Sequence, residues 1–147
     1  MKVLIQRVKQ ANVKVNESIV GSINYGLLVF VGFTTYDTEK DIDYIVKKII
    51  NLRIFDDKNG IMNLSIIDIG GSILSISQFT LYADTSKGHR PSYINSLNSN
   101  EAKKLYDLFN IKLKATNINI ETGIFGSEME VSLVNDGPVT IIIDSKK

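Results

Sequence analysis

The sequence predicts a single domain of the mixed α/β class. Its 147 residues fall within the size range of one ordinary domain. Strand-like segments alternate along the chain with two long segments of helical periodicity. No internal repeat, low-complexity stretch or flexible linker divides the chain. We therefore expect residues 1–147 to form one folded unit.

The first third of the chain has the pattern of four strands. Val3 and Ile5 alternate with polar neighbours, which is typical of a half-buried strand. Asn16-Glu17 separates two further apolar alternations, and this arrangement indicates a hairpin. The run from Leu27 to Phe33 is apolar throughout, so we expect a strand that is buried on both faces.

The middle third predicts a helix, a turn and a strand. Apolar residues at helical spacing indicate a helix that has Asp37 or Thr38 as its N-cap and ends near Asn51. Asp56–Gly60 has turn composition. Ser72–Phe79 follows a Gly-Gly break and has the pattern of a mainly buried strand.

The last third predicts a second helix, with Asn100 as its N-cap, and three more strands. One side of this helix carries Leu105, Leu108, Phe109 and Leu113. The other side carries Lys103, Lys104, Lys112 and Lys114. We expect strands near residues 118–120, 129–134 and 139–143, so the domain would have two main helices and about eight strands.

The composition excludes several kinds of chemistry. With no Cys and a single His, the chain has no thiolate nucleophile, Cys-based zinc site or His-rich metal centre, and we expect no metal or cofactor. The 17 Lys and Arg against 16 Asp and Glu give a net charge of +1, unlike a strongly basic nucleic-acid binder. No apolar run is long enough to span a membrane and no signal peptide is evident, so we expect a cytoplasmic protein without a membrane partner.

Conventional side-chain catalysis finds little support in the sequence. A Ser-His-Asp triad would have to use His89, which lies in an apparent surface loop, and no Gly-x-Ser-x-Gly elbow presents a serine. The carboxylates are spread over turns and helix faces, where solvation or helix capping explains them. Catalysis would therefore depend on a short list of other groups.

Two segments depart from the pattern of a simple sheet protein. In residues 77–82, Ser-Gln-Phe-Thr-Leu-Tyr, a buried strand ends in a cluster of hydroxyl and amide groups. These groups could hydrogen-bond a loop, or the backbone N–H groups there could form an oxyanion hole. In residues 135–140, Asn-Asp-Gly-Pro-Val-Thr, a Gly-Pro dipeptide lies between two strand patterns. This segment could be a plain turn, or it could present bare carbonyl groups, and an X-Pro bond can be cis.

These two segments, in their order, make the chain resemble the D-aminoacyl-tRNA deacylase family. The family motifs Ser-Gln-x-Thr-Leu and Asn-x-Gly-Pro-x-Thr both occur intact. Further blocks of resemblance run from end to end of the chain, at residues 4–8, 51–55, 62–65, 87–92, 122–126 and 131–140. The resemblance implies a homodimer with a partly barrel-like sheet and its active sites at the subunit interface. It also implies a hydrolase that acts on the ester bond of D-aminoacyl-tRNA, and on glycyl-tRNA mischarged on tRNA-Ala.

The same resemblance implies roles for individual residues. The Gly137-Pro138 peptide would be cis and would enter the pocket of the other subunit, where its carbonyl groups leave no room for an L side chain. Arg7 would hold this dipeptide, with Asn135 and Thr140 in support. The catalytic wall would comprise Ser77, Gln78, Phe79 and Thr80, with the N–H groups of Phe79 and Thr80 stabilising the oxyanion.

The nucleophile and the RNA contacts stay open at this point. Thr80 has no base beside it in the sequence, so we favour water activated by the vicinal ribose hydroxyl of the tRNA over a Thr80 nucleophile. The acceptor end would be bound by Lys87 and Arg90 and by the lysine-rich helix face. Two other functions compete with this one: a Thr80-dependent hydrolase of small esters, and a dimeric RNA-end binding module without catalysis.

Overall fold

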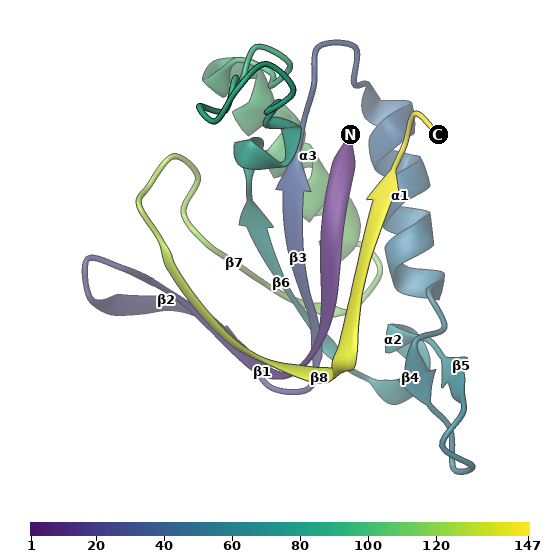
Figure 1. Ribbon diagram of the computed structural model, residues 1–147. Helices are drawn as coiled ribbons and strands as arrows, with labels where there is room; N and C mark the ends of the chain where they lie inside the picture. The colour runs from purple at the N-terminus through teal and green to yellow at the C-terminus, as the bar shows by residue number, and fades with distance from the viewer.

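The computed structural model describes residues 1–147 and contains a six-stranded mixed sheet with helices on one side (Figure 1). The strands of this sheet are β1 (Lys2–Val15), β2 (Ser18–Ile23), β3 (Gly26–Gly32), β6 (Ser72–Ser77), β7 (Asn119–Thr122) and β8 (Glu130–Asp144). A separate hairpin pairs β4 (Phe55–Asp56) with β5 (Met62–Leu64). The helices are α1 (Glu39–Asn51), α2 (Ile66–Ile69), α3 (Ser99–Lys114) and the 3-10 turn η1 (Phe79–Tyr82).

The sheet curls until it nearly closes into a barrel. Its order is β2-β1-β3-β6-β7, with β8 paired to the other side of β1. The strands β3, β6 and β7 run parallel, while β1 is antiparallel to its three neighbours. A Cβ on Gly21 of β2 would lie 2.8 Å from the carbonyl oxygen of Thr122 on β7, so the two ends of this order meet closely.

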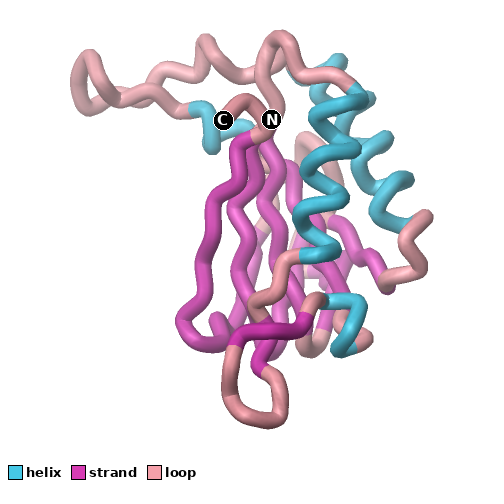
Figure 2. Tube along the Cα trace, turned by 90° about the vertical axis from the view of Figure 1, so that its right-hand side faces the viewer, coloured by secondary structure: helices cyan, strands magenta, loops and turns pink.

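Two apolar clusters stabilise the fold. The larger one lies between the sheet and the helices α1 and α3, which Figure 2 shows packed together along one side of the strands. Its centre includes the fully buried side chains of Ile5, Leu27, Ile45 and Phe109. The smaller cluster lies inside the curl of the sheet and includes Val8, Leu28 and Leu74.

The early strands and the first helix confirm the sequence predictions. Asn16 and Glu17 both have positive φ, as a tight two-residue hairpin requires. Thr38 is the N-cap of α1, and its backbone N–H donates to the Asp41 carboxylate at 2.8 Å. The continuous apolar run forms β3 and is buried along almost its whole length.

Other predicted boundaries were wrong. The N-cap of α3 is Asn98 rather than Asn100, and its Oδ1 accepts a hydrogen bond from the Glu101 N–H. β6 ends at Ser77 rather than Phe79, because the chain leaves the strand at Gln78 and enters η1 at Phe79. The segments near residues 129–134 and 139–143 are one strand, β8, and not two strands joined by a turn. The short helix α2 was not predicted from the sequence. No helix is both long and apolar enough to cross a membrane.

Candidate functional site

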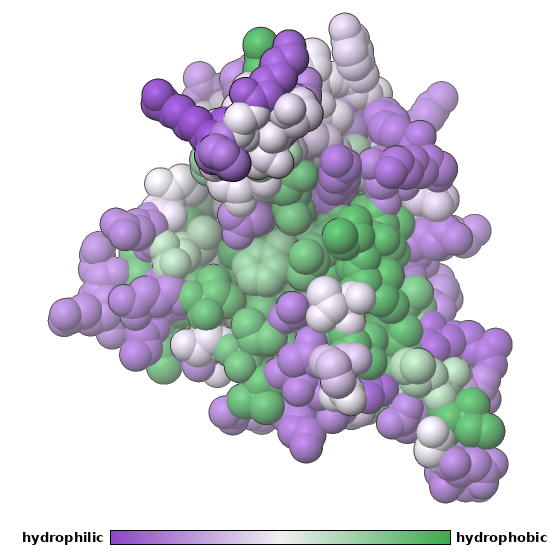
Figure 3. All heavy atoms as spheres, viewed as in Figure 1, coloured by the Kyte–Doolittle hydropathy of each residue, from purple (hydrophilic) through white to green (hydrophobic).

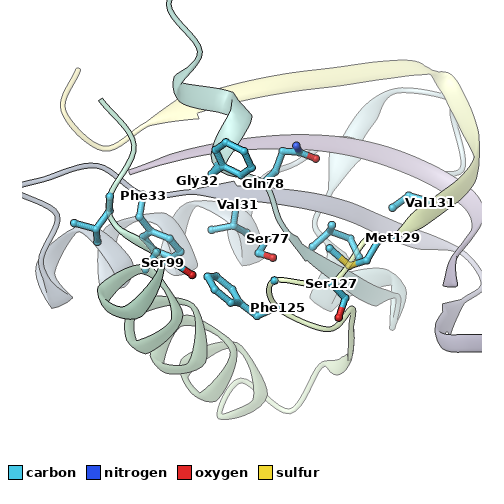
Figure 4. Close-up of a pocket in the computed structure, with 15 residues that line it drawn as sticks. Val31, Gly32, Phe33, Ser77, Gln78, Ser99, Phe125, Ser127, Met129 and Val131 are labelled. Atoms are coloured by element: carbon cyan, nitrogen blue, oxygen red, sulfur yellow. The ribbon is translucent and has the colours of Figure 1, made fainter. Parts of the chain in front are cut away.

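A pocket of about 510 Å³ lies where the parallel strands β3, β6 and β7 end. The carboxyl ends of parallel strands are a common place for ligand sites, because the connections that leave them splay apart. Figure 4 shows Ser77 at the end of β6, Phe125 on the loop after β7 and Ser99 at the start of α3 turned toward the same space. The other lining residues are Val31, Gly32, Phe33, Ile76, Gln78, Phe79, Leu97, Ala102, Gly126, Ser127, Met129 and Val131.

No ionisable side chain lines this pocket. The polar groups available there are serine hydroxyls, the Gln78 amide and backbone groups. The structure also holds no group of three or more His, Asp or Glu side chains placed to bind a metal ion. The wall of the pocket itself therefore offers only hydrogen-bonding groups.

The segment from Ser77 to Thr80 is held in place by β3. The Gln78 N–H donates to the Val31 carbonyl at 2.7 Å, which extends the pairing with β3 by one residue beyond β6. The next two residues open η1, and the first N–H groups of such a turn find no carbonyl acceptor within it. Gly32 allows this close approach, since a Cβ there would lie 2.9 Å from the Gln78 carbonyl oxygen.

The hydroxyl of Thr80 bonds to an amide and not to a base. Its Oγ1 accepts a hydrogen bond from Nε2 of Gln78. His89, the one imidazole of the chain, is exposed on the distant part of the loop between η1 and α3. A threonine nucleophile needs a neighbouring base to take its proton, and the side-chain hydrogen bond of Thr80 is to an amide instead.

The loop between β7 and β8 covers one side of the pocket, although it was expected only as a block of family resemblance and not as part of the pocket wall. Phe125 packs against Tyr106 of α3, with ring centroids 5.8 Å apart. Burial raises the pKa of Tyr106, whose hydroxyl donates to the Ser75 carbonyl at 2.8 Å. The glycines at 123 and 126 in the resemblance block 122–126 were the signal that could have identified this loop.

The Gly137-Pro138 dipeptide lies elsewhere, in a bulge of β8. Asn135 pairs with Val8 and Thr140 pairs with Gln6, so residues 136–139 all lie opposite Arg7 alone. The Gly137-Pro138 peptide bond is cis, and both residues are exposed. The bulge therefore presents its backbone to the outside of the molecule.

Arg7 fixes one side of this bulge. Its side chain is buried, with 5% of the residue exposed. Nε donates to the Asp136 carbonyl at 2.9 Å, and Nη1 donates to the Ile54 carbonyl at 2.6 Å. Carboxylate oxygens of Asp56 and Asp136 each lie 3.3 Å from the guanidinium. Burial raises the pKa of the nearby Tyr25, and the Asp136 carboxylate raises it further.

Asn135 fixes the other side of the bulge. Its Oδ1 accepts from the Val139 N–H at 2.9 Å, and its Nδ2 donates to the Val139 carbonyl at 3.1 Å and to the Thr140 hydroxyl at 3.2 Å. One amide side chain thus closes the bulge across its base. This clamp gives the Asn and Thr of the Asn-x-Gly-Pro-x-Thr motif a structural purpose.

The structure does not bring the dipeptide and the pocket of one chain together. Gly32 beside the pocket pairs with Lys2, whereas the bulge lies opposite Arg7, five positions further along β1. Five extended residues span about 17 Å. Neither Gly137 nor Pro138 lines the pocket.

The basic residues named from the sequence fall into two places. Lys87 and Arg90 are exposed on the loop between η1 and α3. On α3, Lys103 pairs with Asp107, and Lys112 pairs with Glu39 and Asp43 of α1. Lys104 and Lys114 are exposed on the same helix. Two of the four helix lysines are therefore bonded to carboxylates of the chain itself.

The fold and the site place the chain in one class of α/β proteins. In this class the sheet nearly closes into a barrel, and a pocket without ionisable side chains lies at the ends of the parallel strands. Residues 4–144 match the family described as D-Tyr-tRNA(Tyr) deacylase. The chain is 54% identical over 146 residues to a D-aminoacyl-tRNA deacylase of Bacillus cytotoxicus, across 99% of this chain and 100% of that one. It is 56% identical over 148 residues to a D-aminoacyl-tRNA deacylase of Thermosipho melanesiensis, across 100% and 99% of the two chains. The chain therefore belongs to the D-Tyr-tRNA(Tyr) deacylase family.

Solved structures share the whole fold. A structure described as the c-Myc DNA Unwinding Element Binding Protein superposes with a TM-score of 0.93 at 36% identity, across 98% of both chains. A second, described as a probable eukaryotic D-amino acid tRNA deacylase, superposes with a TM-score of 0.84 across 97% of both chains. At 17% identity, this second likeness concerns the fold alone.

Proposed function

We propose that this protein hydrolyses the ester bond between a D-amino acid and the 3′ end of a tRNA, in the cytoplasm, as a proofreading step of translation. The observation that carries this proposal is the pocket without ionisable side chains at the ends of β3, β6 and β7. Family membership over residues 4–144 supplies the substrate class. The products are the free D-amino acid and a tRNA with a free terminal ribose.

The reaction needs a water molecule, an acceptor for its proton and a site for the oxyanion. Water attacks the ester carbonyl carbon, and the ribose oxygen leaves with a proton. The vicinal ribose hydroxyl of the substrate positions and activates the water, because neither the pocket nor Thr80 offers a base. The N–H groups of Phe79 and Thr80 stabilise the oxyanion, since the Gln78 N–H is already bonded to Val31.

Selection against L-amino acids would come from the Gly137-Pro138 bulge of a second copy. The bulge is exposed, held rigidly by Arg7 and Asn135, and about 17 Å along the strand from its own pocket. In a homodimer, the carbonyl groups of Gly137 and Pro138 would enter the partner's pocket and occupy the space of an L side chain. Selectivity would then come from exclusion, so glycine, which has no side chain, would be removed as well.

The face around the bulge fits such a dimer. Leu133, Val134 and Ile142 of β8 are exposed, Ile142 to 66%. Figure 3 shows a broad apolar area in the middle of the face that is viewed in Figure 1. Exposed apolar areas of this kind mark interaction surfaces on small proteins. The two active sites would thus lie at the subunit interface.

Substrate specificity tests the activity. We expect release of amino acid from D-tyrosyl-tRNA and glycyl-tRNA but not from L-tyrosyl-tRNA. Replacing the vicinal ribose hydroxyl by hydrogen is expected to stop the reaction. Full activity on a small ester, together with inactive Thr80→Ala, would favour the Thr80-dependent hydrolase. Tight RNA binding without any hydrolysis would favour the non-catalytic RNA-end binding module. The structure described as the c-Myc DNA Unwinding Element Binding Protein is also named for nucleic-acid binding.

A complementation experiment tests the dimer. Ser127→Trp places a bulky ring on the loop that lines the pocket, and Gly137→Ala disturbs the bulge. Each variant alone is expected to be inactive. Co-expressed in equal amounts, they form mixed dimers in half of the cases, each with one intact site, so activity returns to about a quarter of the wild-type value. No recovery in isolated mixed dimers would contradict the cross-subunit arrangement.

A further inference from the structure

An exposed aromatic pair stands at the rim of the pocket. Phe79 of η1 and Tyr93 of the following loop meet edge to face, with ring centroids 5.0 Å apart. Phe79 is 57% exposed and Tyr93 is 40% exposed, although aromatic rings of this kind gain most from burial. The pair is the one place where the wall of the pocket continues as an exposed aromatic surface.

Hydrogen bonds hold the aromatic pair to the body of the protein. The Ser96 hydroxyl donates to the Phe79 carbonyl at 3.0 Å, and the Ser96 N–H donates to the Tyr93 carbonyl at 2.9 Å. The Leu97 N–H donates to the Phe33 carbonyl at 3.0 Å, close to the pocket. Tyr93 is therefore positioned in advance, and a ligand that stacks on it would lose little entropy in ordering it.

The same loop carries positive charge just beyond the pair. Two reciprocal backbone hydrogen bonds between Asp84 and Ser92 close the loop. The residues inside that closure include Lys87 and Arg90, which have no carboxylate partner in the chain. Figures 1 and 2 show this loop projecting from the end of the sheet, and hydrophilic side chains gather on it in Figure 3.

Aromatic rings beside free cationic side chains are the usual means of binding single-stranded nucleic acid. The bases stack on the rings while the phosphates meet the cations. A pocket of about 510 Å³ suits a ligand of small-molecule size, such as one aminoacylated nucleoside. The nucleotides that precede it must leave the pocket across its rim.

We propose that Phe79 and Tyr93 form a stacking platform for the base of the penultimate nucleotide, with Lys87 and Arg90 bonding the phosphates beside it. This inference rests on the proposed function and adds a second nucleotide subsite to it. Tyr93 acts here as a positioning residue, since it holds the RNA strand and does not touch the ester. The platform explains how a chain of net charge +1 engages an RNA end without a large basic surface.

Two substrates separate the platform from the pocket. The D-tyrosyl ester of adenosine alone fills only the pocket, whereas D-tyrosyl-tRNA also crosses the rim. Tyr93→Ala is expected to raise KM about tenfold for the tRNA, in line with the stacking energy of one base, and to leave its kcat unchanged. KM for the adenosine ester is expected to stay at the wild-type value. Tyr93→Phe should behave as wild type on both substrates.

A fluorescent base gives an independent readout. With 2-aminopurine at the penultimate position of the RNA, binding should quench fluorescence in wild type and in Tyr93→Phe, but not in Tyr93→Ala. Tyr36→Ala, which removes an exposed tyrosine on another loop, serves as the matched control and should change nothing. Melting curves show whether each variant is folded.

The outcomes distinguish the two proposals. Equal KM values for the tRNA in wild type and Tyr93→Ala, with quenching retained, would overturn the platform and leave the deacylase function standing. An equal rise of KM on both substrates would also overturn it, because Tyr93 would then serve the pocket. Failure of the wild type to hydrolyse either substrate would overturn the deacylase function instead.

Discussion

The pocket and the Gly137-Pro138 bulge differ in how the chain builds them. The pocket is assembled from the ends of three parallel strands, one helix start and two loops, and its wall is mainly apolar and carries no ionisable side chain. The bulge comes from one stretch of one strand and is held by charged and amide side chains. The pocket thus needs many segments of the chain, whereas the bulge is a rigid projection formed by one segment. In the proposed enzyme, the catalytic pocket and the element that selects between D- and L-amino acids are therefore separate structures, which only a second copy would bring together.

The largest expected effect comes from displacing the bulge. Gly137 has φ of +138°, and a Cβ there would lie 2.7 Å from a Val139 methyl group and 2.9 Å from its backbone nitrogen. Gly137→Ala must therefore displace the bulge, which in the proposed dimer enters the partner's pocket beside the bound D-amino acid and would then misplace that substrate as well. A misplacement of about 1 Å at a positioning element costs about 100-fold in rate. We expect that loss in kcat/KM for D-tyrosyl-tRNA, measured by release of labelled tyrosine.

A second glycine at a positive φ provides the control for this change. Gly60, at the tip of the β4–β5 hairpin, has φ of +74° and open space around its Cβ position. Gly60→Ala is expected to cost about 1 kcal/mol of stability and no activity. Equal rates in Gly137→Ala and Gly60→Ala would remove the bulge from the mechanism.

The next largest effect concerns the pocket. Gly32→Ala would place a Cβ 2.9 Å from the Gln78 carbonyl oxygen, which is a backbone atom and cannot swing aside. We expect the segment from Ser77 to Thr80 to shift and kcat to fall about tenfold or more. Discrimination between D- and L-tyrosyl-tRNA should stay intact, because the bulge is untouched. Loss of discrimination at normal kcat in Gly32→Ala would show that the two structures are not separate.

Substitutions of Arg7 and Asn135, the two residues that hold the bulge, should have smaller effects, which are measured as losses of stability. Arg7→Met leaves the Asp136 and Ile54 carbonyls without their buried donors, at a cost of about 1–3 kcal/mol for each such group. Asn135→Asp retains the acceptor for the Val139 N–H but loses both donors, so its cost should be smaller. Urea denaturation measures both. A larger loss for Asn135→Asp than for Arg7→Met would reverse the order of importance proposed here.

The smallest effect is a pH dependence at the pocket end of the sheet. Burial alone would raise the pKa of Asp41, but hydrogen bonds from Lys146, Ser145 and Thr38 outweigh it and hold the pKa below the ordinary value of 3.8. A lowered folded pKa stabilises the protein above that value, and the stabilisation is lost as the pH falls below it. Asp41→Asn should therefore be less stable at neutral pH and should lose less stability on acidification. Thermal melts between about pH 7 and pH 3 measure this, and parallel curves for both proteins would contradict it.

Local patterns predicted most of the fold, while long-range packing decided what they missed. The hairpin at Asn16-Glu17, the buried strand β3 and the cap of α1 follow from neighbouring residues. The single strand β8 does not, because Gly137 and Pro138 are turn formers by local propensity. Pairing with β1 on both sides of Arg7 overrides that propensity and turns the expected break into a bulge.

The candidate site shows the same division. The segments 77–82 and 135–140 stood out because polar and Gly-Pro residues interrupted apolar strands. Phe33, Leu97 and Phe125 carried no such signal, since an apolar residue that lines a pocket looks like a core residue in a sequence. Their role depends on the curl of the sheet, which brings the ends of β3, β6 and β7 together.

The bulge also bears on how the protein stays in solution. β8 pairs only with β1, so its outer edge presents free N–H and C=O groups over a strand of 15 residues. Long open edges invite strands of other molecules to add on and begin aggregates. Pro138 has no N–H to offer, and the bulge bends the edge at its middle. The bulge that is proposed to select a substrate thus also divides this edge into two short pieces, neither of which is a good template for aggregation.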